Sequence, residues 1–166
     1  MPNKYTMTGV TDASYTGAAN KLQLWAIKVG PTTPLAIDYI SCHGSSDTAD
    51  SLGLTLARYT GAHAGMTDFT AVLLEGSIGT GKPASAVSNT GAGLAVYDST
   101  GQTDGTTLTS LYRWRVSTQS GGGLDIWFPE WTVVCASATF IGLFQESGQT
   151  VTACQLSFTV NWRELG

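Results

Sequence analysis

The chain has 166 residues, a formal net charge of −4 and a charged fraction of only 12%, which together fit one acidic folded domain. Its eight lysine and arginine residues are scattered, which argues against a nucleic-acid-binding surface. Aromatic residues make up 10%, too many for a disordered chain, and abundant threonine, serine and glycine favour an all-β protein with many turns.

Two further patterns concern the compartment in which the chain is made. The first residues show no basic segment followed by an apolar one, so we expect no secretory signal, and no apolar run is as long as a membrane span. The three cysteines, Cys42, Cys135 and Cys154, are odd in number and widely spaced. They predict three reduced, buried thiols in a protein made in the cytoplasm.

The N-terminal part divides into an arm and a strand. Residues 1–20 are polar and rich in glycine and threonine, and we expect an arm with at most one short strand. Residues 21–29 alternate as a strand does, with two apolar sets of side chains, Leu22, Leu24 and Ala26 against Trp25, Ile27 and Val29. A strand that is apolar on both faces is covered on both, here by the domain and by something else.

The next segments are predicted from turn residues and alternation. A turn over residues 30–34 leads into a strand over 35–43, and a polar loop over 44–51 precedes a strand over 52–59. A long irregular insert follows over 61–93. A loop of that length in a compact domain is usually functional or makes contacts of its own.

The second half supplies the remaining predicted strands, over residues 94–97, 108–116, 124–128, 131–135, 139–144 and 150–162. In the last of these, apolar and polar side chains alternate from Cys154 to Trp162, which predicts one apolar and one solvated face. The total is eight or nine strands without βαβ alternation. We therefore predict an all-β domain over 21–166, an antiparallel sandwich of two sheets.

Several of these features occur together in a known family. A strand, turn and strand over residues 22–42 precede the polar loop Ser45-Ser46-Asp47 and a strand that ends Arg58-Tyr59-Thr60-Gly61. A long insert follows, and the last strand closes on Arg163-Glu164-Leu165-Gly166. In this order of features the chain resembles the capsid decoration, or cement, proteins of tailed bacteriophages, which are built on a jelly roll. The resemblance implies a homotrimer on the outer capsid surface that bridges coat subunits, with no catalytic residues.

From this resemblance we expect a virion structural protein, not an enzyme, with a jelly-roll-like fold. Its partners would be other copies of itself and the major capsid protein, with no nucleic acid, membrane or cofactor. The candidate subunit interface is the apolar set Trp25, Ile27 and Val29. The candidate capsid contacts lie in the arm and the insert, at Tyr5, Met7, Phe69, Leu73 and Ile78.

The main alternative is a carbohydrate- or receptor-binding β-sandwich of a phage fibre or tail. It depends on the tryptophans, Trp25, Trp114, Trp127, Trp131 and Trp162, because aromatic faces stack on sugar rings. Alternation groups Trp114 and Trp162 with other apolar residues and leaves the other three less determined. Exposed aromatic residues in a groove would favour this alternative, whereas a flat apolar base with a three-fold contact would favour decoration.

Other motifs in the chain do not amount to sites. Residues 76–82, GSIGTGK, have the spacing of a phosphate-binding loop, but Pro83 stands where that motif needs serine or threonine. His43 and His63, with Asp47, Asp50 and Asp68, lack the spacing of metal ligands, and residues 98–105 lack the calcium-loop pattern. An enzyme would require His43 or His63 to meet a carboxylate in a pocket.

Overall fold

The structure, a computed structural model, describes residues 4–11, 15–18, 22–29, 32–60, 67–68, 72–75, 93–94, 107–130, 132–136 and 139–165. All regular secondary structure in these ranges is β-strand. Two six-stranded antiparallel sheets and one two-stranded sheet contain the strands. The expectation of an all-β chain is therefore confirmed. Nowhere in these ranges is there a helix long and apolar enough to span a membrane.

The first sheet, which we call the β14 sheet, has the order β10-β4-β14-β1-β7, with β11 also paired to β4. Its strands are β1 (Lys4–Val10), β4 (Leu35–Gly44), β7 (Val72–Glu75), β10 (Gly123–Trp127), β11 (Val134–Cys135) and β14 (Leu156–Glu164). The C-terminal strand β14 lies between β4 and β1 and pairs with both along most of its length. It occupies the middle of this sheet.

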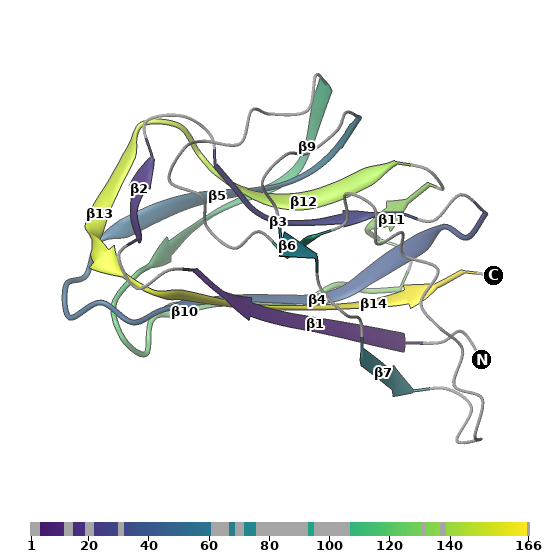
Figure 1. The fold of residues 1–166 in the computed structure, drawn as a ribbon, viewed down its shortest axis with the longest axis horizontal. Coiled ribbons are helices and arrows are strands. Elements are labelled where there is room, and N and C mark those ends of the chain that lie inside the picture. The colour runs from purple at the N-terminus through teal and green to yellow at the C-terminus, as the bar shows by residue number, and fades with distance from the viewer. Residues whose placement is uncertain are drawn as a thin grey trace.

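The second sheet, which we call the β12 sheet, has the order β6-β8-β3-β12-β5-β9. Its strands are β3 (Leu22–Lys28), β5 (Ser51–Thr60), β6 (Thr67–Asp68), β8 (Gly93–Leu94), β9 (Thr107–Ser117) and β12 (Phe140–Gln145). The small third sheet pairs β2 (Tyr15–Ala18) with β13 (Gln149–Cys154). Figure 1 shows the two large sheets as two layers, with β2 and β13 at one end of them.

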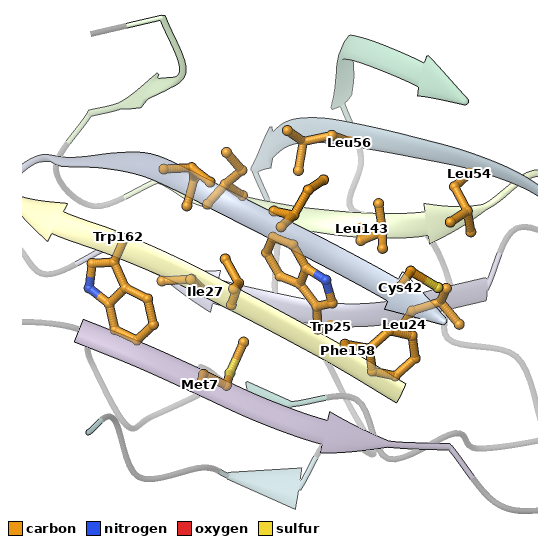
Figure 2. Packing of buried hydrophobic residues seen from close by; sticks show 14 of the residues in the cluster. Met7, Leu24, Trp25, Ile27, Cys42, Leu54, Leu56, Leu143, Phe158 and Trp162 are labelled. Atoms are coloured by element: carbon orange, nitrogen blue, oxygen red, sulfur yellow. The ribbon is translucent and has the colours of Figure 1, made fainter. Parts of the chain in front are cut away.

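One buried cluster fills the space between the layers. Leu54 of β5 and Leu143 of β12 belong to this cluster together with Phe158 and Trp162 of β14, and all four are buried (Figure 2). Alternation along each strand places these residues on the inner face, since successive side chains point to opposite sides. Apolar burial of this extent is the main stabilising contribution in a domain of this size.

A second, smaller cluster lies on the outer side of the β12 sheet and consists of Ala26, Ala57, Tyr59 and Phe144. An irregularity in the pairing of β3 with β12 falls opposite the step from Leu143 to Phe144, and it allows the adjacent residues Leu24 and Trp25 both to join the main core. Strand β3 is therefore covered on both faces within a single chain.

The predicted strand over residues 150–162 is two strands, which separate at Gln155. The Gln155 N–H donates to Ser45 Oγ instead of to a neighbouring strand. The next residue is fixed by Thr11, whose hydroxyl accepts the Leu156 N–H at 2.8 Å and whose own N–H donates to the Leu156 carbonyl. These hydrogen bonds, two of them to side chains, end one ladder and begin another, so β13 pairs with β2 while β14 enters the large sheet.

The predicted arm over residues 1–20 contains β1, an interior strand of the β14 sheet, and β2. Of the insert predicted over 61–93, the structure describes β6, β7 and the first residue of β8. The described ranges hold fourteen strands where eight or nine were expected. The additional strands are β1 and β2 in the predicted arm, β6 and β7 in the predicted insert, and the one gained when the last predicted strand divides into β13 and β14. The predicted strands over 94–97 and 131–135 are shorter than expected, because β8 and β11 have two residues each.

Candidate functional site

The predicted subunit interface is wrong. Trp25, Ile27 and Val29 are buried in the main core, packed between the two sheets of their own chain (Figure 2). The sequence indicated correctly that both faces of this strand are covered. It did not reveal that the covering surfaces belong to the same chain, so these three residues are not available to a neighbouring subunit.

Two of the predicted capsid contacts are also wrong. Tyr5 and Met7 are buried in the core, and the Tyr5 ring stacks on Trp162 with ring centroids 5.8 Å apart. Leu73 belongs to β7, where it pairs with Tyr5 across the ladder. Phe69 and Ile78 lie outside the described residues. Tyr5 and Met7 therefore form no surface for coat protein.

The metal-like residues do not come together in the described part of the chain. No three histidine, cysteine, aspartate or glutamate side chains in it are close enough to hold a metal ion. The Asp50 carboxylate instead accepts the Thr152 N–H, a bond that lowers the pKa of Asp50. His63, residues 76–82 and residues 98–105 lie outside the described ranges.

The three cysteines are free and buried, as predicted. Burial raises the pKa of the Cys42 thiol to about 12, with a smaller contribution from the negative charge on an ionised Cys154. Burial also raises the pKa values of Cys135 and Cys154. Because the reactive species is the thiolate, these thiols are held in their unreactive form.

His43 does meet a carboxylate, on the outer face of the β14 sheet. Its Nε2 lies 3.2 Å from Asp125 Oδ2, and the Tyr39 hydroxyl donates to Asp125 Oδ1. The register of β4 and β10 brings these groups together, with Tyr39 opposite Trp127, Ser41 opposite Asp125 and His43 opposite Gly123. Hydrogen bonds from Tyr39 and then His43 lower the pKa of Asp125, and the bond to Asp125 raises that of Tyr39.

Trp127 adds an exposed aromatic ring to this group. Its side chain is 72% exposed, and its ring lies against Tyr39 with centroids 4.4 Å apart. The order of residues in β10 explains the exposure, because Leu124 and Ile126 point to the core and leave Asp125 and Trp127 on the outer side. We call Tyr39, His43, Asp125 and Trp127 the outer-face cluster.

The outer-face cluster could have been found in part from the sequence. The segment LDIWF alternates in the same way as the strands that were recognised, so Asp125 and Trp127 were predictable as neighbours on one face. The pairing with Tyr39 and His43 was not, because it depends on the register between strands more than 80 residues apart, as the Tyr39–Asp125 and His43–Asp125 bonds show.

A second surface feature lies where the edge strands β9 and β10 approach each other. Five apolar side chains there are only partly buried or exposed, and we call them the aromatic flank: Leu111, Tyr112, Trp114, Leu124 and Ile126. Tyr112 is 37% exposed and stacks on Trp114, with ring centroids 5.7 Å apart. Its ring also contacts Phe128, which follows β10, so both sheets contribute to the flank.

A cavity of about 530 Å³ opens near the C-terminal end of β5, beside Arg58 and Tyr59. Its described lining is largely apolar, with residues such as Pro34, Tyr59 and Val134, and Arg58 is the one charged side chain in that lining. The His43–Asp125 pair is not part of it. The side chains of His43 and Asp125 are 39% and 54% exposed, so histidine and carboxylate meet on an open sheet face, where they can bind a ligand, rather than in a site that excludes water.

Comparison with known proteins gave no relative for this chain: no family model, no curated protein and no solved structure matches it.

Proposed function

We propose that the protein is a virion structural protein of a tailed bacteriophage, which decorates the outer surface of the capsid as a homotrimer and stabilises the shell. Its mechanism is binding rather than catalysis. The proposal rests on the resemblance carried by residues 22–61 and 150–166, on the order of the strands, and on the aromatic flank.

The order of the strands supports a jelly-roll-like sandwich. Eight strands of the two large sheets have five or more residues, namely β1, β3, β4, β5, β9, β10, β12 and β14. Among these eight, the first pairs with the last, the second with the seventh, the third with the sixth and the fourth with the fifth. Folding one long antiparallel ribbon into two sheets produces these pairs, and that is how a jelly roll is built.

The observation that carries the oligomeric proposal is the aromatic flank. The described tryptophans Trp25 and Trp162 are fully buried, whereas Trp114 and Tyr112 stay partly open beside two edge strands. Edge strands and exposed apolar rows are usually covered, because they otherwise promote aggregation. A second copy of this chain, laid against β9 and β10, would cover both features at once.

The charges on the two edges favour a head-to-tail contact between copies. Strand β9 exposes Arg113 and Arg115, whereas β10 is followed by the exposed Glu130. A contact that places the β9 edge of one copy against the β10 edge of the next brings opposite charges together. Such heterologous contacts close into rings when the rotation permits, and a ring of three is a trimer.

The first test is the native mass, measured by light scattering, of the wild-type protein and two variants. The monomer is 17.4 kDa, and we expect a wild-type species of three times that mass. Tyr112→Lys places a charge in the aromatic flank and should give a folded monomer. Val10→Lys, at an exposed apolar residue of β1, is the matched control and should leave the mass unchanged. A wild-type monomer at all concentrations would contradict the proposal.

The second test concerns the capsid. Purified wild-type protein should co-sediment with capsids that lack it and should raise the temperature at which they release DNA. Many copies can stabilise a shell even when each contact is weak, because linked contacts act at high effective concentration. A stable trimer that neither co-sediments with capsids nor stabilises them would support the oligomeric proposal and contradict the proposal of capsid decoration.

A further inference from the structure

The outer-face cluster has the composition of a ligand site, although the oligomeric proposal gives it no task. Trp127 is the most exposed large apolar side chain among the residues described, at 72%. An exposed tryptophan leaves a large apolar area unburied, and tryptophan is enriched at binding surfaces, where a partner can cover that area. Beside it, Tyr39 and His43 both contact the Asp125 carboxylate, so these polar side chains hold one another in place.

One face of the indole is supported and the other is open. The Tyr39 ring lies against Trp127 at a centroid distance of 4.4 Å with the planes inclined by 36°. Tyr39 is itself held by the bond from its hydroxyl to Asp125. The indole is therefore supported on one side by Tyr39, and 72% of its side chain remains exposed for stacking on a flat ligand. A supported ring loses less conformational entropy on binding.

Asp125 supplies a fixed hydrogen-bond acceptor next to this ring. An ionised carboxylate has about four acceptor positions, and Tyr39 and His43 take one each. Asp125 is 54% exposed, so its remaining positions face solvent. The lowered pKa of Asp125 keeps the group ionised at neutral pH, and a charged acceptor forms the stronger type of hydrogen bond.

His43 is positioned by Gly123, its partner across the ladder. A Cβ at Gly123 would lie 2.3 Å from His43 Nδ1 and 2.7 Å from the Cys42 carbonyl oxygen, so a larger residue could not be placed there without displacing them. The absence of a side chain lets the imidazole lie over β10 and reach Asp125. Both ring nitrogens are polar and the side chain is 39% exposed, which makes it a second hydrogen-bonding group for a ligand.

We propose that the outer-face cluster is a carbohydrate-binding site, in which the apolar face of a neutral saccharide stacks on the open face of Trp127 while its hydroxyls bond to Asp125 and His43. A neutral sugar fits because one ring face is apolar and its rim carries hydroxyl donors for the carboxylate. An acidic sugar would be repelled by Asp125. A quaternary ammonium ion prefers several rings around it, and here Tyr39 occupies one face of the indole instead of forming a second wall.

The test is an array of immobilised oligosaccharides of neutral hexoses and N-acetylhexosamines, with sialylated glycans alongside, probed with the full-length protein. The strongest neutral ligand is then titrated by calorimetry into wild-type protein and variants. Trp127→Ala and Asp125→Asn should each weaken binding by about tenfold or more, the loss expected for one stacking contact or one charge-assisted hydrogen bond. Val10→Ser, on the outer face of the same sheet, should leave binding unchanged.

Folding and oligomeric state are followed by circular dichroism and native mass, so that a lost ligand site is distinguished from a lost fold or trimer. Binding of neutral glycans that depends on Trp127 and Asp125, in variants of unchanged fold and mass, supports the proposal. It is overturned if the wild-type protein binds no neutral glycan, if Trp127→Ala binds as well as wild type, or if choline alone binds at Trp127.

Discussion

The ionic contacts of Arg163 allow the effect of burial on an ion pair to be measured within one side chain. The guanidinium donates from Nε and Nη2 to Asp38 Oδ1, at 2.8 and 2.5 Å, and from Nη1 to Glu130 Oε1 at 2.7 Å. The side chains of Arg163 and Asp38 are only 11% and 13% exposed, whereas Glu130 is 71% exposed. The distances are similar, so the two carboxylates differ in burial and in the number of bonds they accept, two at Asp38 and one at Glu130.

Replacement of Asp38 should therefore cost much more stability than replacement of Glu130. Removing one partner of a buried pair costs about 3–5 kcal/mol, because a desolvated charge is left behind. Since Arg163 keeps some exposure and Glu130 remains, we expect about 2–3 kcal/mol for Asp38→Ala. Glu130→Ala removes an exposed partner and should cost below about 1 kcal/mol. In a chain of this size, the loss at Asp38 corresponds to a fall in Tm of roughly 5–10 °C.

Urea denaturation followed by circular dichroism, at neutral pH and low salt, gives the loss of unfolding free energy for each variant. High salt should reduce the loss for Glu130→Ala and leave the loss for Asp38→Ala unchanged, because salt screens exposed charges more than buried ones. Arg163→Met provides the third variant, which removes the charge and leaves the packing of the side-chain stem. It should cost less than Asp38→Ala, because no desolvated cation remains. Equal losses for Asp38→Ala and Glu130→Ala would refute the argument from burial, as would an Asp38 variant as stable as wild type.

Three shorter predictions follow from the buried groups and one close contact. Because burial raises the thiol pKa values, a disulfide reagent at pH 8 should react slowly with the native protein and rapidly with three thiols after denaturation; a fast native phase would contradict this. Burial raises the pKa of Tyr59 and raises that of Cys42 to about 12, so both stay protonated in the folded chain while the unfolded chain ionises from pH 9.0 upward. The resulting stability is complete below that pH and is lost as pH rises toward 12, which urea midpoints should follow. Gly44→Ala would place a Cβ 2.1 Å from the Thr118 carbonyl oxygen and should destabilise by about 1–3 kcal/mol; an unchanged urea midpoint would exclude that clash.

The sequence predicted the long strands well because each has a strong local signal. Strands β3, β4, β5, β9, β10 and β12 fall within a residue or two of the expected ranges. Side-chain alternation is a property of consecutive residues, and it needs no knowledge of the partner strand. The break at Gln155 has no such signal, since alternation continues through it and only hydrogen bonds to the distant residues Thr11 and Ser45 divide the strand.

The error at the N-terminus has a different cause. Tyr5 and Met7 alternate with threonines as inward residues of a strand would, but surrounding glycine and threonine made the segment resemble a surface arm. Its burial depends on β14, more than 140 residues away, which supplies the ladder for β1. Threonine is a good strand residue when a sheet is present to accept it, so composition alone could not distinguish the two outcomes.

The tryptophans show why a candidate surface cannot be chosen from apolar content alone. Trp25 was chosen because its neighbours Ile27 and Val29 share its face, and the same neighbours place it in the core. Trp127 shares its face with the charged residue Asp125, and a charged neighbour indicates that this face of β10 is solvated. In an amphipathic strand, a large aromatic residue on the polar face is the better candidate for binding.

Strand β10 connects the two proposals, because its inward residues Leu124 and Ile126 belong to the aromatic flank and its outward residues Asp125 and Trp127 to the outer-face cluster. A trimer assembled through the flank would therefore carry three saccharide sites, each near a subunit boundary. Linked sites bind a glycan-coated surface about 10²–10⁴-fold more tightly than one site does. Tyr112→Lys should then keep the wild-type affinity for a free oligosaccharide in calorimetry and lose most retention on the same sugar immobilised at high density. If both measurements fall together, the flank and the sugar site are not separate features, and the division of β10 into two functional faces is wrong.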